Sequence, residues 1–288
     1  MNRNYLVAWD GTESAEKALE YAAMLASSSS GKLHMWQSFH PPRMRAMMMS
    51  RDMRDIYDRW IQDKCDEMAR AMERRAESIP SRGLPIDTEV HVGDVLDGLI
   101  AEAQRTGADF IVLGKGKEKN RIGSLVLKVL RATRRPVIVV PAEFDVRPPS
   151  HVLVPIDLTI QDSASMDVAI DLAQVFDLKI DVLHVVEIYI YESPDAIKEV
   201  LDKLVFEELN QWKEINLRKA ENISIQTHVR KAIDAASGIQ EFVESEGINL
   251  MIMDSHTRSG LMHFLLGSVA EKIIRGASIP VILTKPEL

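Results

Sequence analysis

Residues 249–285 read NLMIMDSHTRSGLMHFLLGSVAEKIIRGASIPVILTK, and this stretch decides the fold. The apolar run Leu250–Met253 predicts a strand, Gly267 and Ser268 open a predicted helix, and Val281–Thr284 predicts a closing strand. A polar loop that joins a strand to a helix N-terminus presents free backbone N–H groups and the positive end of the helix dipole. Both favour an anion such as phosphate.

An earlier stretch repeats this design. Residues 109–140 read DFIVLGKGKEKNRIGSLVLKVLRATRRPVIVV, with a second Gly-Ser pair at the predicted helix start. Three correspondences link the halves at offsets that drift only from 144 to 150, which indicates a duplicated unit with loop-length changes. The corresponding pairs are Asp10 and Asp157, His34 and His184, and Gly123-Ser124 and Gly267-Ser268.

Strands and helices alternate in each half, and this order predicts an α/β fold. We expect two tandem domains, residues 1–145 and 146–288, joined at a segment that contains two adjacent prolines. Each should hold a five-stranded parallel sheet of order 3-2-1-4-5 with helices on both faces. Ligands of such sheets lie beyond the strand C-termini where the strand order reverses. This rule places Asp10 beside the Gly114 loop and Asp157 beside Asp254.

Composition limits the class of protein. The 288 residues are 46% apolar and 27% charged, as expected of a globular protein with real cores. Cys65 is the single cysteine, which excludes an internal disulfide and favours a reducing compartment. Its helical spacing from Met68 and Met72 predicts that the thiol is buried. No apolar run approaches the roughly 20 residues of a membrane span, so we expect a cytoplasmic protein without a membrane partner.

Charge is shared unevenly between the halves. Residues 1–145 hold 22 basic and 21 acidic side chains, whereas residues 146–288 hold 13 and 22, which gives the net charge of −8. An acidic chain is a poor nucleic-acid binder, because neutralisation of phosphates dominates that affinity. If one half binds a polyanion, the first half is favoured.

Four stretches carry a family resemblance. They read VAWDGTESAEKALEYA (7–22), VPIDLTIQDSASMDVAIDLA (154–173), DVLHVV (181–186) and LLGSVAEKIIRGASIPVIL (265–283). In order and spacing they resemble the universal stress protein family, over nearly the whole chain. The resemblance implies a flavodoxin-like, Rossmann-like domain that often dimerises through its final strands. In a tandem chain we expect the halves to form this pair internally, and a homodimer of whole chains stays open.

ATP-binding members of that family carry the pattern G-x2-G-x9-G followed by Ser or Thr. Glycines let the backbone approach the phosphates. The first half offers Gly114, Gly116, Gly123 and Ser124, in a loop four residues shorter than the pattern. The second half keeps the spacing and Gly267-Ser268, but its first two glycine positions hold Asp254 and Thr257. We expect the Asp254 carboxylate to repel a phosphate.

The resemblance also implies roles for other residues. Asp10 would orient the ribose or a Mg²⁺ ion, and the backbone of Met35 or Trp36 would meet the base. Trp9 either stacks on the base or fills its space. Asp157, Val185, Gly267 and Ser268 are the counterparts in the second half. The basic loop, defined by Lys115, Lys117, Lys119 and Arg121, suits an anion or is a solvated surface.

Other constellations point less directly to chemistry. Asp157, Asp254 and His256 could together bind a metal ion, but two carboxylates and one imidazole are not specific for any metal, and we disfavour this site. His34 and His184 are expected to be structural, and Ser14, Ser124 and Ser268 to be helix caps or phosphate donors, because no accompanying base is identifiable. The Met-rich segment 44–53 predicts either a flexible flap or an adaptable pocket wall.

Three functions therefore remain open. The first is a stress-response sensor that binds ATP, with Mg²⁺, or another small anionic ligand in one half. The second is a protein of the same family that binds no nucleotide and acts by engaging a protein partner. The third is a weak nucleotide hydrolase, although the sequence identifies no catalytic residue.

Overall fold

The computed structural model describes residues 2–42, 50–80, 83–116, 123–158, 163–187, 195–218, 220, 223–255 and 266–285. The first repeat contains β1 (Asn4–Ala8), α1 (Glu13–Ser28), β2 (Lys32–Phe39), α2 (Arg51–Glu77), β3 (Ile86–Val92), α3 (Val95–Arg105), β4 (Phe110–Gly114), α4 (Ser124–Ala132) and β5 (Val137–Val140). The second repeat contains β6 (His151–Ile156), α5 (Ala164–Ala173), β7 (Lys179–Glu187), α6 (Asp195–Asn216), β8 (Ser224–Ala232), α7 (Ala235–Glu246), β9 (Leu250–Asp254), α8 (Ser268–Gly276) and β10 (Val281–Thr284).

All ten strands form one sheet, in the order β3-β2-β1-β4-β5-β10-β9-β6-β7-β8. Within each repeat the paired strands are parallel, and the predicted order 3-2-1-4-5 is confirmed twice. The central strands are continuous apolar runs because helices cover both of their faces. β5 and β10, for example, are buried along their whole length.

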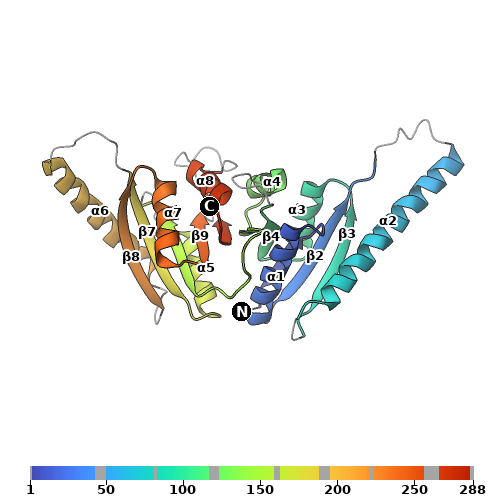
Figure 1. Cartoon of the computed structure of the whole chain (residues 1–288), viewed down its shortest axis with the longest axis horizontal. Helices are drawn as coiled ribbons and strands as arrows, with labels where there is room; N and C mark the ends of the chain where they lie inside the picture. Colours follow the sequence, from blue (N-terminus) through green and yellow to red (C-terminus); the bar gives the residue numbers. More distant parts are fainter. Residues whose placement is uncertain are drawn as a thin grey trace.

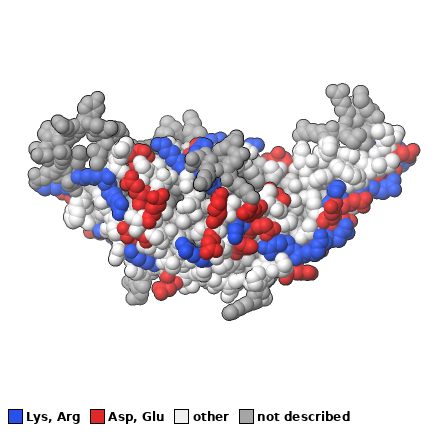
Figure 2. Space-filling model, in the orientation of Figure 1, with Lys and Arg blue, Asp and Glu red and all other residues white. Residues whose placement is uncertain are grey.

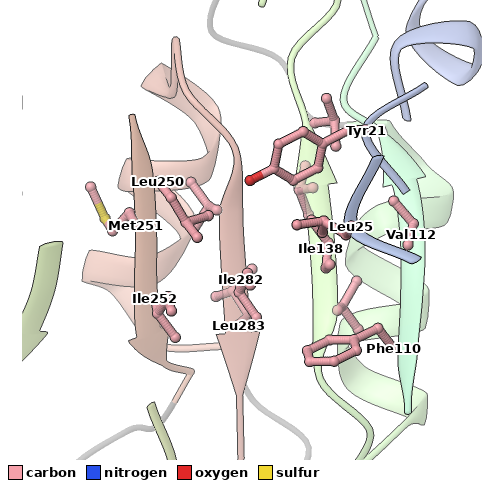
Figure 3. Close-up of a cluster of buried hydrophobic side chains, with 14 of the residues drawn as sticks. Tyr21, Leu25, Phe110, Val112, Ile138, Leu250, Met251, Ile252, Ile282 and Leu283 are labelled. Carbon is pink, nitrogen blue, oxygen red and sulfur yellow. The ribbon is translucent and has the colours of Figure 1, made fainter. Parts of the chain in front are cut away.

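The two repeats join through β5 and β10, which pair antiparallel with Ile138 opposite Ile282. The expected internal pairing of the final strands is therefore present in this chain. Figure 3 shows apolar side chains of both repeats around this junction, among them Leu25 from α1 and Leu283 from β10. One hydrophobic core consequently runs through both repeats and needs no second chain to bury the β5 edge.

Two long helices mark the outer ends of the molecule. α2 lies beside β3 and α6 beside β8, and both extend away from the sheet (Figure 1). Met72 is the one described residue of α2 that is fully buried, and Cys65 is only half-buried. The prediction of a core position for Cys65 is therefore wrong, because α2 packs against the sheet mainly near its C-terminal end, where Met72 lies. Burial still raises the pKa of the Cys65 thiol.

The surface of α2 is charged with both signs. Figure 2 shows Lys, Arg, Asp and Glu side chains interspersed along it, as expected of a helix that faces water. None of the helices in the described part of the chain combines the length and the apolar character that a membrane crossing requires.

Candidate functional site

A cavity of about 700 Å³ opens at the C-terminal ends of β1, β2 and β4. In a parallel sheet of this order, this edge is where the strand order reverses and where ligands bind. Five of the predicted binding residues line it together: Asp10, Gly114, Gly116, Gly123 and Ser124. The cavity has the size of a small-molecule site, for which about 300–1,000 Å³ is usual.

Asp10 follows β1 and stands at the mouth of the cavity. Its Oδ1 accepts hydrogen bonds from Thr12 N at 3.0 Å and from Thr12 Oγ1 at 2.6 Å. Thr12 also caps α1, because its Oγ1 accepts from the backbone N–H of Ala15. Ser14, which the sequence suggested as that cap, lies inside the helix instead and lines the cavity.

Three glycines shape the floor of the cavity. A Cβ at Gly114 would lie 2.4 Å from the backbone oxygen of Ser14, so only glycine lets β4 and α1 approach this closely. Gly116 has φ +94°, a conformation that favours glycine, and it faces open space. Gly123 is the N-cap of α4 and offers no side-chain cap. The first N–H groups of α4 are therefore without intrahelical partners beside the cavity.

Ser124 and Ser268 are the first helical residues of α4 and α8, and Gly123 and Gly267 precede them as N-caps. Neither helix start has a side-chain capping bond. The prediction that these serines act as helix caps is therefore wrong. Their position keeps them next to the first backbone N–H groups of each helix, which have no intrahelical acceptor, and a hydroxyl there can donate to an anion.

Two indole side chains, Trp9 and Trp36, also line the cavity. Met35 is fully buried in the core, whereas Trp36, Gln37 and Ser38 line the cavity. Trp9 also lines it, and its Nε1 donates to Glu16 Oε1 at 2.8 Å. This bond fixes the indole against α1, so the ring forms part of the cavity wall.

The sequence matches a known family twice. The model of the Universal stress protein family covers residues 1–141 and 149–285. The chain belongs to the universal stress protein family. Universal stress protein Slr1230 of Synechocystis sp. is 22% identical over 309 aligned positions, which span 97% of this chain and 99% of the relative.

A second relative of this universal stress protein is Universal stress protein MJ0531 of Methanocaldococcus jannaschii. It is 29% identical over 120 residues, which span 41% of this chain and 71% of the relative. The crystal structure of a universal stress protein from Archaeoglobus fulgidus DSM 4304 superimposes with a TM-score of 0.72, at 20% identity, over 98% of each chain. That likeness shows the tandem α/β fold.

The second repeat of this universal stress protein uses Asp254 where the first has Gly114. Both residues end the fourth strand of their repeat. The Asp254 carboxylate accepts bonds from Ser165 N at 3.1 Å, Ser165 Oγ at 3.0 Å, Ser163 Oγ at 3.2 Å and Thr284 Oγ1 at 2.6 Å. These bonds tie the start of α5 and the end of β10 to the end of β9.

Lys115 was placed in a loop that either suits an anion or is a solvated surface; its side chain is buried, which rules out the second alternative for this residue, and it lines the cavity. Its Nζ donates to the carbonyl of Ala277 at 2.9 Å, at the C-terminal end of α8 in the second repeat. Lys285 makes the reciprocal contact, donating to Thr133 O at 2.7 Å at the end of α4. Both lysines sit at negative helix ends. Burial lowers the pKa of both ammonium groups.

The strand register also corrects one correspondence between the halves. Leu6 pairs with His34, and its counterpart Leu153 pairs with Asp181. At the offset of 147 that relates Asp10 to Asp157, His34 therefore corresponds to Asp181 rather than to His184. His34 Nδ1 lies 3.4 Å from Asp87 Oδ2. Burial lowers the pKa of His34, although the Asp87 carboxylate acts in the opposite direction.

Some predicted residues lie outside the described part of the chain. These are Lys117, Lys119 and Arg121 of the basic loop, His256, Thr257 and Arg258 of the second loop, and residues 44–49 of the Met-rich segment.

The structure also places the residues predicted for the second repeat. Asp157 follows β6, Val185 packs against the position of Gly238, and Gly267 N donates to Ser255 O at 3.2 Å.

Sequence reasoning missed the residues that hold Trp9. Glu16 accepts from Trp9 on one carboxylate oxygen and from Arg75 Nε of α2, at 2.6 Å, on the other. The chain Trp9–Glu16–Arg75 thus connects the cavity to the long outer helix. The position of Glu16 in the first turn of α1, seven residues after Trp9, is a signal for the first contact. No local pattern indicates a contact with Arg75, 59 residues away.

Proposed function

We propose that this universal stress protein is a stress-response sensor that binds one nucleotide, with ATP as the first choice, in the cavity of its first repeat. The cavity of about 700 Å³ carries this proposal, because it brings three glycines, Ser124 and Asp10 to the edge of the sheet where α4 begins. Free N–H groups and a helix dipole are the features that hold phosphates.

Each part of the cavity suits one part of the nucleotide. The backbone of Gly114, Gly116 and Gly123, together with the hydroxyl of Ser124, would hold the phosphates. Asp10, exposed at the mouth, would orient the ribose or a Mg²⁺ ion brought in with the phosphates. The base would contact the backbone of Met35 or Trp36, with Trp9 as the adjoining wall.

The second repeat is proposed to serve mainly as the built-in partner of the first. Asp254 is already engaged by Ser163, Ser165 and Thr284, and its negative charge stands where the phosphate pattern has a glycine. Asp157, Val185, Gly267 and Ser268 would at most supply a weaker second site.

Native mass spectrometry of the freshly purified protein, without and then with added Mg-ATP, tests the proposal. We expect one nucleotide per chain. A Cβ at Gly123 would have its nearest neighbour, Lys115 O, at 3.9 Å, so Gly123→Asp fits sterically but places a carboxylate at the start of α4. We expect this variant to lose nucleotide and the matched Gly267→Asp variant to keep it. Unchanged affinity in Gly123→Asp would contradict the assignment.

A second candidate function is a protein-interaction module. Large apolar side chains are exposed on both outer helices: Met53, Ile56 and Trp60 on α2, and Leu204, Phe206 and Ile215 on α6. Exposed apolar clusters commonly mark interaction sites. An absence of any nucleotide adduct at millimolar Mg-ATP would favour this function over the sensor.

A further inference from the structure

A second cavity, of about 330 Å³, lies between the two repeats. One wall is built from residues that precede β1, β4 and β5, so it is at the opposite edge of the sheet from the nucleotide cavity. The other wall is α5 of the second repeat and the turn after it, which contribute apolar side chains such as Leu172 and Phe176. The cavity therefore exists only where the two repeats meet.

Its polar lining carries a net positive charge. Three guanidinium groups (Arg3, Arg134 and Arg135) face two carboxylates (Asp109 and Asp171), which leaves a charge of +1. Arg3 pairs with both carboxylates and so joins the repeats. Arg135 donates to the backbone oxygen of Ala108. Arg134 is exposed and has no partner in the described part of the chain.

The lining also contains a buried hydroxyl that has no hydrogen bond of ordinary geometry among the described residues. Tyr5 is 1% exposed and stacks on Phe110 at 5.3 Å between ring centroids. Its hydroxyl makes no hydrogen bond of ordinary geometry with the described residues, although the hydroxyl of Ser29 lies near it. Burial raises the pKa of Tyr5 to about 12, so the phenol stays a neutral donor at physiological pH. A buried hydrogen-bond donor without an acceptor destabilises the folded protein, unless a bound molecule supplies the acceptor.

We propose that this inter-repeat cavity is a second ligand site, which takes a small monocarboxylate with an apolar body. The carboxylate would face Arg134 and the Tyr5 hydroxyl, and the apolar body would lie against Leu172 and Phe176. A monoanion matches the +1 charge of the lining, and the cavity volume is at the lower end for small-molecule sites, about 300 Å³. Because both repeats supply walls, the bound ligand ties the repeats together.

Calorimetric titration of the full-length protein with sodium phenylacetate tests the site. 2-Phenylethanol has the same ring without the charge, and inorganic phosphate has charge without the apolar body. We expect phenylacetate to bind at least about tenfold more tightly than either control, a ratio that corresponds to about 1.4 kcal/mol. No phenylacetate binding, or equal binding of phosphate or 2-phenylethanol, would overturn the proposal.

Matched variants place the ligand. Tyr5→Phe and Tyr21→Phe each remove a buried hydroxyl without a partner, but Tyr21 is not among the described residues that line the cavity. Figure 3 shows the Tyr21 hydroxyl near the β5–β10 junction. We expect Tyr5→Phe to weaken phenylacetate binding several-fold and Tyr21→Phe to leave it unchanged. Equal effects of the two variants would contradict the assigned contact.

Arg134→Gln supplies the test of the charge, with the exposed Arg131→Gln on the same segment as its control. We expect about a tenfold loss of phenylacetate affinity in Arg134→Gln only, as for one charge-assisted hydrogen bond. Gly123→Asp, which affects the nucleotide cavity, should leave phenylacetate binding unchanged. This variant separates failure of the nucleotide site from failure of the carboxylate site. Equal losses in both arginine variants would overturn the role of Arg134.

Discussion

At the scale of single residues, the two repeats differ at the last position of their fourth strand. Gly114 lets α1 pack directly on β4, because any Cβ there would overlap the backbone of Ser14. Asp254 instead reaches the start of α5 and accepts bonds from two serines and from Thr284. Close packing in one repeat is thus replaced by a buried polar network in the other.

We expect Asp254→Ala to destabilise the protein by about 1–3 kcal/mol, because Ser163, Ser165 and Thr284 lose their common acceptor in a buried site. Asp254→Asn should cost less, since an amide oxygen still accepts. The urea dependence of unfolding measures both free energies. Equal stability of wild type and Asp254→Ala would show that water replaces the carboxylate without cost.

A second buried carboxylate, Asp181, predicts a dependence on pH. Burial by itself would raise the pKa of Asp181, but the hydrogen bond from His151 and the nearby side chains of His228 and Lys179 outweigh burial and lower this pKa below its ordinary value of 3.8. The unfolded chain therefore binds this proton more readily than the folded protein. The stabilising contribution is present above the ordinary pKa and is lost as the pH falls through the folded pKa.

For this reason we expect Asp181→Asn to lower the free energy of unfolding by about 3 kcal/mol at about pH 5, because His151, His228 and Lys179 lose the fully buried carboxylate that they face. The difference from wild type should shrink at about pH 3, because the contribution of Asp181 fades as the pH falls below its ordinary pKa of 3.8 towards the lower pKa of the folded state. Urea unfolding at both pH values gives the comparison. A constant difference between the two would rule out Asp181 as the titrating group.

At this scale the sequence predicts positions better than contacts. Asp10, Gly114 and Gly123 could be expected at one sheet edge, because parallel strands end together, and they line one cavity. Nucleotide binding there stays a prediction. The bond from Lys115 to Ala277 could not be predicted, because it joins residues 162 apart in different repeats. The buried position expected for Cys65 failed because periodicity does not say how closely a helix approaches its sheet.

At the scale of elements, helices α4 and α8 are matched at both ends. Each begins at a Gly-Ser pair, as the sequence predicts, and each ends at a lysine from the other repeat. Each lysine therefore binds the C-terminal end of a helix in the other repeat, and both contacts cross the junction between the repeats. Sequence pattern alone locates elements such as the closing strand, whose expected bounds Val281–Thr284 are those of β10 in the structure.

We expect Lys115→Met and Lys285→Met each to cost up to about 1 kcal/mol, since each removes a cation from a helix C-terminus. The desolvation that lowers the pKa of both lysines offsets part of this contribution. Hydrogen exchange of the β5 and β10 amides should accelerate in both variants. Lys128→Met, at an exposed position of α4, is the control and should leave exchange unchanged.

Unchanged exchange in Lys115→Met and Lys285→Met would mean that the β5–β10 ladder holds the junction without the lysines. Acceleration in the Lys128→Met control as well would point to a general effect of lost charge on α4. Faster exchange in Lys115→Met and Lys285→Met, together with unchanged exchange in Lys128→Met, would assign the effect to the two helix ends.

At the scale of the whole molecule, the β5–β10 ladder makes one sheet of two repeats. We expect isolated residues 1–145 to form a homodimer, because β5 would otherwise expose an apolar edge that pairs readily with another strand. Light scattering at micromolar concentration measures the mass. Ile138→Lys in the same fragment should be monomeric, and a monomeric parent fragment would contradict this account of the junction.

The covalent link between the repeats has a consequence for how equivalent positions in the two repeats can change. In a dimer of identical chains, the two-fold axis copies every substitution into both halves, so a carboxylate at the Gly114 position would alter both pockets at once. A tandem chain removes that coupling. Asp254 changes the end of the fourth strand in one repeat while Gly114 keeps it in the other, and a single polypeptide can therefore assign different tasks to two halves of common origin.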